Sequence, residues 1–274
     1  MKNWDKWIKT SVDCLKDYIQ HYNLKSIVLG LSGGIDSTVS AVICYLATKD
    51  MPEVTFIGRS LPIMNGSDEK IIAKQLGEKL CDDFAEVDMR EFYHPWRLLF
   101  YEEEDESKAN KINDGNLMAR MRMMYLYQLA STHKGIVIDT DNMTEHELGF
   151  YTVHGDVGDY NVGIRWLWKS EVWELAEVLK HWVPKAEDII QESINMQPTD
   201  GNCGGTDLDQ IAPGASYGDV DYILSSLEDR FTYRQAIEAY GIELVSRIED
   251  RCIANSYKDK LPITPKIMKE ISNE

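Results

Sequence analysis

Short apolar runs alternate along this 274-residue chain with longer segments in which apolar residues recur every three or four positions. The short runs are typical of buried strands, and the longer segments are typical of amphipathic helices. Strands are predicted at 26–30, 54–58, 84–87 and 135–139, and helices at 12–22, 37–48, 68–80, 115–133, 170–180, 219–227 and 233–254. Because strands and helices alternate, we expect an α/β fold with a parallel sheet and helices on both faces, as in Rossmann-like domains.

Residues 194–218 follow no periodic pattern and are rich in Pro, Gly, Asn, Asp and Thr. Connections of this length are uncommon inside a compact domain and often act as lids over a site. We therefore predict a mobile lid at 194–218. No internal repeat or linker divides the sequence, so we expect a single domain over residues 1–274.

Composition and charge narrow the class of protein. Apolar residues make up 43% of the chain and charged residues 27%, as in ordinary globular enzymes. The net charge of -17 argues against a broad nucleic-acid-binding face, which needs clustered Lys and Arg. The N-terminus lacks the apolar core of a signal peptide, and no apolar run is long enough to span a bilayer. We expect a cytoplasmic protein without nucleic-acid or membrane partners, whose five dispersed cysteines are free thiols.

A glycine loop joins the first predicted strand to the following helix. Its residues are Gly30, Leu31, Ser32, Gly33, Gly34, Ile35, Asp36 and Ser37. At such a junction the backbone N–H groups and the positive end of the helix point to one place, which favours phosphate. The paired glycines permit close backbone approach, Ser32, Ser37 and Thr38 offer hydroxyl donors to phosphate, and Asp36 offers a carboxylate to a divalent cation. The alternative is an ordinary glycine-rich turn, since the loop matches neither the Walker nor the Rossmann fingerprint.

Two residues further along the chain point to the same crevice. Thr140 follows a predicted strand, so it lies at the sheet edge where open α/β sheets bind ligands. Glu145 shares a helical face with Asp141, which places it to join Asp36 around Mg²⁺. The alternative for Glu145 is a solvated helix carboxylate.

The helix predicted at 115–133 carries a basic residue beside its apolar side. The apolar stripe consists of Leu117, Met121, Met124 and Gln128. Arg120 leaves the helix next to this stripe, so we expect a guanidinium that is paired or ligand-bound there.

Several motifs carry a resemblance to a known family. The sequence Ser-Gly-Gly-x-Asp-Ser at 32–37, directly after an apolar strand, resembles the loop of the ATP pyrophosphatases. Three later motifs are Asp-Gly-Asn-Leu-Met-Ala-Arg-Met-Arg-Met at 114–123, Thr-Asp-Asn-Met-Thr-Glu-His-Glu-Leu-Gly-Phe at 140–150 and Gly-Asp-Val-Gly at 155–158. Together and in this order they resemble the ammonia-dependent NAD synthetases over residues 12–262. The resemblance implies the N-type ATP pyrophosphatase fold, which is adenine nucleotide alpha hydrolase-like.

The resemblance also implies roles for the matching residues. ATP is expected on the loop from Gly30 to Ser37 and on Arg59, Thr140, Lys169 and Thr199. Mg²⁺ is expected on Asp36 and Glu145. Deamido-NAD is expected on Arg120, Asp159 and Lys258. Without the resemblance, Lys169 and Lys258 would each be interpreted as surface lysines.

The chain departs from the family pattern on the dinucleotide side of the site. Val153 stands where the family commonly has a lysine near the nicotinate, so a carboxylate-binding charge is missing there. Tyr160 stands in place of an aspartate, which Asp159 restores if the alignment shifts by one residue. Tyr257 and Asp259 replace a histidine and an arginine of the C-terminal element. Adenylation is therefore better supported than the identity of the substrate.

The implied reaction has two steps. The nicotinate carboxylate of deamido-NAD attacks the α-phosphate of ATP and pyrophosphate leaves, after which ammonia displaces AMP and gives NAD. Asp36, Glu145 and Lys169 are expected to act on the departing pyrophosphate, the two carboxylates through Mg²⁺. Asp156 is a hypothetical acceptor of a proton from ammonium. The resemblance further implies a homodimer, with free ammonia or a separate donor protein as the nitrogen source.

Three alternatives stay open at this point. A tRNA-thiolating adenylase uses a similar loop, but the acidic balance and the missing cysteine pairs count against it. The complete set of Asp36, Glu145 and Lys169 counts against a non-catalytic nucleotide sensor. A synthetase that acts on nicotinate mononucleotide or another carboxylate is compatible with Val153 and Tyr160.

Overall fold

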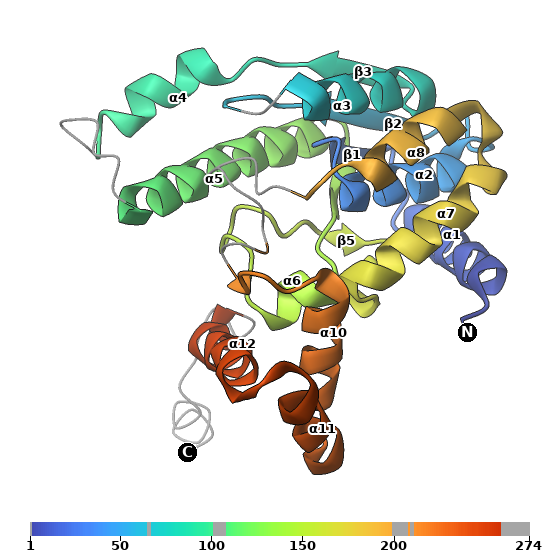
Figure 1. Cartoon of the computed structure of the whole chain (residues 1–274). Coiled ribbons are helices and arrows are strands. Elements are labelled where there is room, and N and C mark those ends of the chain that lie inside the picture. The colour runs from blue at the N-terminus through green and yellow to red at the C-terminus, as the bar shows by residue number, and fades with distance from the viewer. Residues whose placement is uncertain (1, 65–66, 101–107, 199–207, 209–210, 259–274) are drawn as a thin grey trace, which may run out of the picture.

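A five-stranded parallel sheet forms the centre of the molecule (Figure 1). The computed structural model describes the whole chain except residues 1, 65–66, 101–107, 199–207, 209–210 and 259–274. The strands are β1 Ser26–Gly30, β2 Thr55–Ser60, β3 Asp83–Glu86, β4 Gly135–Asp139 and β5 Tyr160–Asn161. Their order is β3-β2-β1-β4-β5, and every neighbouring pair is parallel. The predicted α/β fold is therefore confirmed, and β5 is a strand that the sequence pattern did not indicate.

Helices cover both faces of this sheet. One face carries α1 Trp4–His21, α2 Ile35–Thr48, α3 Ser67–Leu80, α7 Lys169–Trp182 and α8 Glu187–Asn195. The other face carries α4 Arg90–Arg97 and α5 Lys108–Thr132 (Figure 1). In β1, Ile27 and Leu29 pack into the apolar cluster under α1, α2, α3, α7 and α8. Val28 packs into the apolar cluster on the opposite face, under α4 and α5. Both faces of β1 are therefore buried, which is why its sequence is a continuous apolar run.

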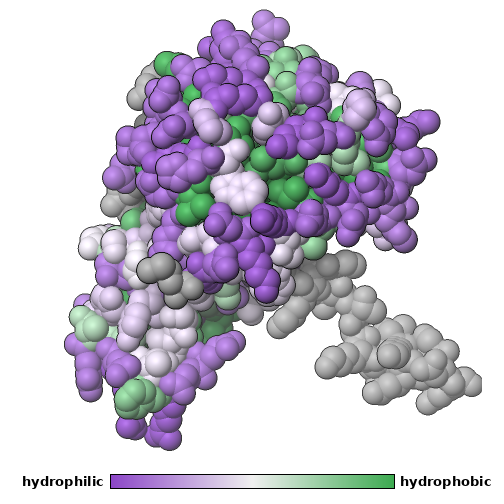
Figure 2. Space-filling model, turned by 90° about the vertical axis from the view of Figure 1, so that its right-hand side faces the viewer, coloured by the Kyte–Doolittle hydropathy of each residue, from purple (hydrophilic) through white to green (hydrophobic). Residues whose placement is uncertain are grey.

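A smaller helical lobe lies below the sheet and its helices in Figure 1. It contains α6 Met143–Glu147, α10 Tyr217–Ser226, α11 Arg230–Tyr240 and α12 Ile242–Asn255. The lobe has its own apolar cluster around Leu148, Val220 and Ile248. The predicted helix at 233–254 is in fact two helices, because Gly241 adopts a φ of 82° that ends α11. The face shown in Figure 2 is largely hydrophilic over both parts, in keeping with the net charge of -17.

Several element boundaries differ from the predicted ones. Helix α1 begins at Trp4 because the Asn3 side chain accepts a hydrogen bond from the Lys6 backbone N–H, 3.0 Å away, and caps it. Helices α4 and α8 were not predicted. A helical turn through Asp141 and Glu145 was expected, but α6 begins only at Met143, so Asp141 lies outside the helix. On α5 the predicted apolar stripe is wrong at its C-terminal half. Met124 is 54% exposed and Gln128 is exposed, whereas the buried side is formed by Met118, Met121, Met123, Leu126 and Ala130.

The predicted lid lies mostly outside the described residues, since 199–207 and 209–210 are not among them. The C-terminal part of the predicted lid packs against the small lobe, because Ile211 and Ala212 are buried in the apolar cluster of that lobe. Cys14, Cys44, Cys81 and Cys252 are free thiols as predicted, and Cys203 lies outside the described residues. Among the described residues, no helix is both long and apolar enough to cross a membrane.

Candidate active site

A pocket of about 620 Å³ opens at the carboxyl ends of β1, β2 and β4. Parallel sheets bind ligands at this edge because loops from several strands converge there. Most of the predicted site residues line it, namely Gly30, Leu31, Ser32, Gly34, Ile35, Asp36, Ser37, Arg59, Thr140, Glu145, Asp156, Lys169 and Lys258. The structure thus brings together residues that are more than 200 positions apart in the sequence.

The glycine loop forms one wall of the pocket. The Ser32 Oγ accepts a hydrogen bond from the Gly34 backbone N–H at 3.2 Å and lies 3.0 Å from the Ser37 Oγ. The Ser37 hydroxyl donates to the Gly34 carbonyl at 3.0 Å. Gly34 caps α2 without any side-chain hydrogen bond to the first turn. The positive end of α2 is therefore directed at the pocket, as an anion-binding site requires.

Gly33 does not line the pocket but shapes the loop. Its φ is 89°, and a Cβ at this position would lie 2.2 Å from the Glu69 carbonyl oxygen of α3. Both the left-handed backbone and the close approach of α3 exclude a side chain. The position therefore requires glycine for packing, whereas Gly34 has an ordinary φ of -70°.

A buried hydroxyl pair supports the loop from behind. The Thr38 and Ser193 hydroxyls lie 3.0 Å apart, and the Ser193 hydroxyl also donates to the Gly33 carbonyl at 3.2 Å. Thr38 was expected to offer its hydroxyl to phosphate, but that hydroxyl is buried and points to α8 instead. Sequence reasoning missed Ser193 because α8 itself was not predicted.

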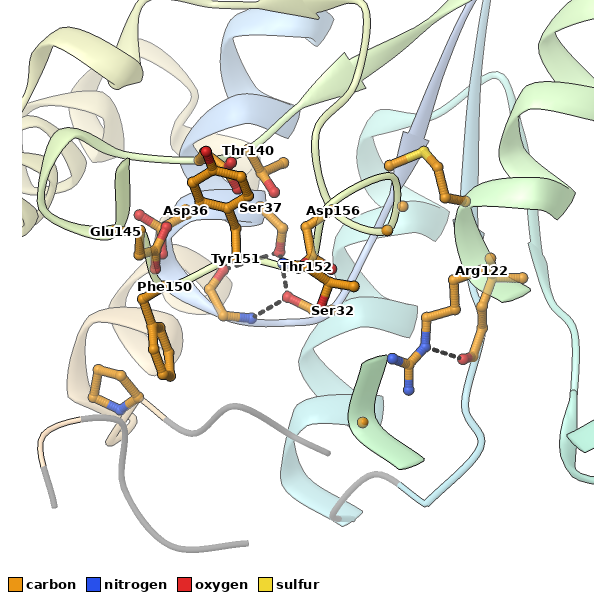
Figure 3. Close-up of a pocket in the computed structure, with 18 of the residues that line it drawn as sticks. Ser32, Asp36, Ser37, Arg122, Thr140, Glu145, Phe150, Tyr151, Thr152 and Asp156 are labelled. Carbon is orange, nitrogen blue, oxygen red and sulfur yellow. Dashed lines mark hydrogen bonds between the residues drawn. The ribbon is translucent and has the colours of Figure 1, made fainter. Parts of the chain in front are cut away.

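Lys169, Asp36 and Glu145 meet at the side of the loop (Figure 3 labels the two carboxylates). The Lys169 Nζ is 2.5 Å from the Asp36 Oδ2 and 3.1 Å from the Glu145 Oε1. The lysine side chain is 3% exposed and the two carboxylates are 14% and 18% exposed. Such a low exposure strengthens the attraction between the charges and makes the loss of either partner costly.

Asn142 fixes both carboxylates. Its side-chain N–H donates to the Asp36 Oδ1 at 2.9 Å, and its side-chain oxygen accepts from the Glu145 backbone N–H at 3.0 Å. The Glu145 carboxylate in turn accepts from the Asn142 backbone N–H at 3.2 Å, which completes a capping box on α6. Asn142 is completely buried. Sequence reasoning missed this residue, although its place three positions before Glu145 is the signal of a capping box.

The donor set of Asp36 and Glu145 fits a hard divalent cation. Both carboxylates face one point that already holds the positive charge of Lys169. No group of three or more His, Cys, Asp or Glu suited to a metal occurs within the described part of the chain. Two carboxylates are typical of a Mg²⁺ site that is completed by substrate phosphates and water.

Asp156 occupies another part of the pocket, across from Asp36 and Glu145 (Figure 3). Its Oδ2 accepts a hydrogen bond from the Thr152 backbone N–H at 2.5 Å. Burial raises the pKa of Asp156 above its ordinary value, while the Thr152 hydrogen bonds and the charges of Arg122 and Lys258 act in the opposite direction. Because burial dominates, the carboxyl is a stronger proton acceptor than an exposed aspartate.

Arg59 and Lys258 line the pocket, and both side chains also bind neighbouring protein groups. The Arg59 Nη2 lies 2.9 Å from the Asp83 Oδ2, and its hydrogen bond lowers the pKa of the Asp83 carboxyl. The Lys258 Nζ donates to the Gly149 and Tyr151 carbonyls at 2.5 and 2.7 Å. Burial is the main cause that lowers the pKa of Lys258. Lys258 therefore ties the end of α12 to the loop that follows α6.

Two of the predicted dinucleotide residues lie outside this pocket. Arg120 is exposed, and its Nε donates to the Val153 carbonyl at 3.1 Å. The Asp159 carboxylate accepts from the Tyr127 hydroxyl at 2.9 Å and from the Val137 backbone N–H at 3.0 Å. These two residues lie on the outer surface near α5. Tyr160 packs against the Tyr18 ring of α1, and Thr199 lies outside the described residues.

The fold and the pocket together define an adenine nucleotide alpha hydrolase-like protein with a glycine loop at the end of β1. The sequence model of the NAD synthase family matches residues 7–262. The chain therefore belongs to the NAD synthase family.

Individual relatives agree with this assignment. The NH(3)-dependent NAD(+) synthetase of Chlorobium phaeobacteroides is 31% identical, over 93% of this chain and 88% of the relative. That of Methanosarcina mazei is 30% identical, over 93% and 96% of the two chains. Among solved structures, the NMN synthetase from Francisella tularensis has a TM-score of 0.79 at 26% identity, covering 97% of this chain and 100% of that one. The NH3-dependent NAD synthetase from Campylobacter jejuni, at a TM-score of 0.75, 24% identity and the same coverage, has the same fold.

Proposed function

We propose that this single-domain chain is an ammonia-dependent NAD synthetase, a ligase that converts deamido-NAD, ATP and ammonia into NAD, AMP and pyrophosphate. The observation that carries the proposal is the cluster of Lys169, Asp36 and Glu145 at the edge of the glycine loop. A pyrophosphate group needs neutralisation from several sides, and here a helix end, a lysine and a carboxylate pair suited to Mg²⁺ surround one space. A non-catalytic sensor would not require this set.

The roles divide between the two ends of the pocket. ATP binds the loop from Gly30 to Ser37 with its phosphates, assisted by Arg59, Thr140, Lys169 and Thr199. Asp36 and Glu145 would hold Mg²⁺, which neutralises phosphate charge when bound. Asp156, Arg122 and Lys258 lie close enough to interact electrostatically, and this part of the pocket faces the reacting carboxylate.

The first step forms an acyl adenylate. A carboxylate oxygen of the nicotinate ring forms a bond to the α-phosphorus of ATP, and the bond from that phosphorus to the bridging oxygen breaks. Pyrophosphate leaves with the electron pair of this bond. Lys169 and the loop N–H groups stabilise the charge that develops on it, since they are already fixed in position before the reaction.

The second step forms the amide. The nitrogen of ammonia bonds to the carbonyl carbon, the bond from that carbon to the AMP oxygen breaks, and AMP leaves with the electron pair. The nitrogen then releases one proton to water, which leaves the neutral amide. Ammonia exists mainly as ammonium at neutral pH, so a base must take a proton before the attack. Asp156 suits this role because burial raises the pKa of its carboxyl above the ordinary value of 3.8.

The outer position of Arg120 and Asp159 supports a homodimer whose dinucleotide site is shared between subunits. Both residues lie outside the pocket, beside Met124 and Tyr127, which are 54% and 39% exposed on α5. A second copy on this surface would cover these side chains and bring Arg120 to a ligand. Light scattering of the purified protein tests the dimer, and a monomer at micromolar concentration would contradict it. We also propose a cytoplasmic location, which fractionation of cells tests.

The proposed activity is tested with ATP, ammonium and deamido-NAD in the presence of Mg²⁺. We expect NAD, AMP and pyrophosphate in equal amounts, and no AMP when deamido-NAD is omitted. Formation of ADP and phosphate, or release of pyrophosphate without an amide product, would contradict the proposal. Substitution of glutamine for ammonium without a donor protein is expected to give no product.

One observation favours a second candidate substrate, nicotinate mononucleotide. The solved structure with a TM-score of 0.79 is described as an NMN synthetase. Val153 and Tyr160 replace charged residues that the family commonly places near the dinucleotide, and Tyr160 is packed on Tyr18. Competition between deamido-NAD and nicotinate mononucleotide in one reaction decides between them, because the ratio of products equals the ratio of kcat/KM values at equal concentrations.

A further inference from the structure

Arg251 lines the pocket without an anionic partner among the described residues. It lies on α12, partly buried, with its guanidinium carbon 5.3 Å from the centroid of the Phe150 ring. Its Nε is buried and has no hydrogen-bond partner within the described part of the chain. A buried donor without an acceptor costs free energy, and in a native protein it calls for an explanation.

The charge of Arg251 is not neutralised by its own surroundings. Burial lowers the pKa of Arg251, and the group that raises it is the Cys252 thiol rather than any carboxylate of the described residues. Burial raises the pKa of Cys252 to about 11, so this thiol carries no charge at neutral pH. The Phe150 ring attracts the guanidinium weakly and accepts no hydrogen bond from the orphaned Nε. The guanidinium therefore suits an anion that a ligand brings into the pocket.

The pocket wall around Arg251 is positively charged. Helix α12 and the residues directly after it place Arg251, Asn255 and Lys258 on the pocket. Burial is the main cause that lowers the pKa of Lys258, and the charge of Arg251 lowers it further, so the two cations lie close together. The carboxylates of the described residues that line the pocket come from other segments, namely Asp36, Glu69, Asp141, Glu145 and Asp156.

This wall lies apart from the glycine loop. Helix α12 belongs to the small lobe, whereas the loop belongs to the end of β1 in the sheet (Figure 1). Phe150, which contacts Arg251, lies beside Glu145 and is joined through Tyr151 and Thr152 to the segment that carries Asp156 (Figure 3). A ligand on Arg251 is therefore held from the lobe side, next to the part of the pocket assigned to the reacting carboxylate.

We propose that Arg251 binds the phosphate group on the nicotinate riboside of the second substrate, a group that deamido-NAD and nicotinate mononucleotide share. The inference rests on the proposed function. A planar guanidinium contacts two oxygens of a phosphate with parallel hydrogen bonds, and the orphaned Nε gains an acceptor. The neighbouring Lys258 adds a second positive charge on the same wall.

The reacting carboxylate suits Arg251 less well than the phosphate does. The carboxylate must bring an oxygen to the α-phosphorus and loses its charge in the first step, so a tight ion pair would stabilise it before the reaction and slow its attack. The phosphate keeps its charge from substrate to product. A residue that binds it stabilises the substrate and the transition state equally, which lowers KM and leaves kcat unchanged.

The test uses four ligands that separate the phosphate from the carboxylate. They are nicotinate mononucleotide, nicotinamide mononucleotide and the two ribosides that lack the phosphate. Calorimetry gives their dissociation constants for the wild type, Arg251→Met and Arg247→Met, the last being an exposed arginine on the same helix. We expect Arg251→Met to bind both mononucleotides about 10- to 100-fold more weakly and both ribosides within about threefold of wild type. Arg247→Met is expected to match the wild type.

The other patterns of loss would overturn the proposal. A loss for both nicotinate ligands and for neither nicotinamide ligand would assign Arg251 to the carboxylate. Equal losses for all four ligands, or no loss, would leave it without a phosphate contact. A wild type that binds the mononucleotides no more tightly than the ribosides would show that the phosphate is not recognised. ATP binding should stay within about threefold in Arg251→Met, and a loss confined to ATP would assign the residue to the wrong nucleotide.

Two further measurements exclude a purely structural role. Arg251→Lys keeps the charge and loses the planar geometry, so we expect a smaller loss that is again confined to the mononucleotides. Without ligand, Arg251→Met should unfold at no lower a temperature than wild type, because it removes a buried donor that has no acceptor in the described structure. A lowered melting temperature with unchanged binding of the mononucleotides would contradict the proposal.

The binding comparison needs no turnover, so it is separate from the test of the proposed function. In the activity assay we expect Arg251→Met to raise the KM of the nicotinate nucleotide and to leave kcat within about twofold. If the wild type forms no amide from either nucleotide but the phosphate-dependent loss is observed, the proposed function is wrong and the role of Arg251 stands. If the amide forms and the loss is absent, the role of Arg251 is wrong and the function stands.

Discussion

The Lys169 ammonium lies 2.5 Å from the Asp36 carboxylate, although the two residues are 133 positions apart in the chain. The contact joins the first turn of α2 to the first residue of α7. Lys169 is held there from its own backbone as well, since its N–H donates to the Thr144 hydroxyl at 2.8 Å. The cation proposed to stabilise pyrophosphate thus also neutralises the carboxylates proposed to hold Mg²⁺. Binding of Mg²⁺ to these carboxylates therefore competes with Lys169, and phosphate that draws the lysine away removes this competition.

We predict that Lys169→Met makes the two carboxylates available to Mg²⁺ without nucleotide. The variant leaves Asp36 and Glu145 facing each other, which costs about 2 kcal/mol, less than the roughly 3–5 kcal/mol of a fully buried pair because both are partly exposed. Thermal unfolding is measured with and without Mg²⁺. We expect Mg²⁺ alone to raise the melting temperature of the variant and to leave that of the wild type unchanged.

Lys180→Met is the matched control on the same helix. Lys180 pairs with Glu177, whose side chain is 51% exposed, so this variant is expected to lose less than about 1 kcal/mol. It should show no response to Mg²⁺. If Mg²⁺ raised the melting temperature of wild type, Lys169→Met and Lys180→Met by the same amount, Lys169 would not compete with the metal.

The local part of this site could be predicted from the sequence, whereas its distant contacts could not. The apolar run at 26–30 and the glycines after it specify a strand, a turn and a helix within one short segment, and the structure has them in these places. The pairing of Lys169 with Asp36 depends on how α7 packs on α2, and it was not predicted. The family resemblance implied only that both residues belong to the ATP site. The place of Arg122 in the pocket was not predicted, because it depends on the packing of α5 against β1 and β4.

Asp156→Asn tests the proposed base. Burial raises the pKa of the Asp156 carboxyl above 3.8, so the group is protonated at low pH and becomes a proton acceptor as pH rises through its raised pKa. We expect the wild-type kcat/KM for ammonium to fall with decreasing pH through a step above pH 3.8, measured at a constant concentration of ammonium. Asp156→Asn should lose activity by about 100-fold and should lack that step. An acid step of the same position in the variant would assign it to another group.

The Asp156 carboxyl also affects how the free energy of unfolding depends on pH. Between pH 3.8 and the raised pKa, the folded state binds more protons at Asp156 than the unfolded state does. The contribution of this residue to the free energy of unfolding is therefore largest at low pH and falls as pH rises through that interval. Denaturant unfolding across this range should show a shallower decline for Asp156→Asn than for wild type, and a steeper decline would contradict the assignment.

Gly33→Ala tests whether the loop needs glycine for its backbone or for its contact with α3. The φ of 89° is unfavourable for alanine, and the new Cβ would meet the Glu69 carbonyl at 2.2 Å. We expect a loss of about 1–2 kcal/mol from the backbone alone, a further loss from the clash, and ATP binding weakened by about tenfold or more. Gly241→Ala is the control, because its φ is 82° and, apart from its own neighbours in the chain, no atom of the described residues lies within 4 Å of the new Cβ.

This pair of variants separates two physical causes. If strain in φ dominates, Gly33→Ala and Gly241→Ala should lose similar amounts in chemical unfolding. If the contact with α3 dominates, Gly33→Ala should lose clearly more. Only Gly33→Ala is expected to weaken ATP binding, since Gly241 lies between α11 and α12, away from the pocket. Weakened ATP binding in both variants would mean that the turn between α11 and α12 also shapes the nucleotide site.

Ser193→Ala examines the support of the loop by a helix that the sequence pattern missed. Helix α8 is only nine residues long, so its buried Ile189 and Ile190 do not build a recognisable period. Its Ser193 hydroxyl nevertheless contacts the Thr38 hydroxyl and the Gly33 carbonyl inside the protein.

Removal of the Ser193 hydroxyl leaves two buried polar groups without this contact, which costs about 1–3 kcal/mol. Because Gly33 belongs to the glycine loop, we expect the KM for ATP to rise while the KM for the carboxylate substrate stays within about twofold. Ser193→Thr, which keeps a hydroxyl, should restore ATP binding if the added methyl group is accommodated. Loss of stability without any change in ATP binding would show that α8 stabilises the fold but does not position the loop.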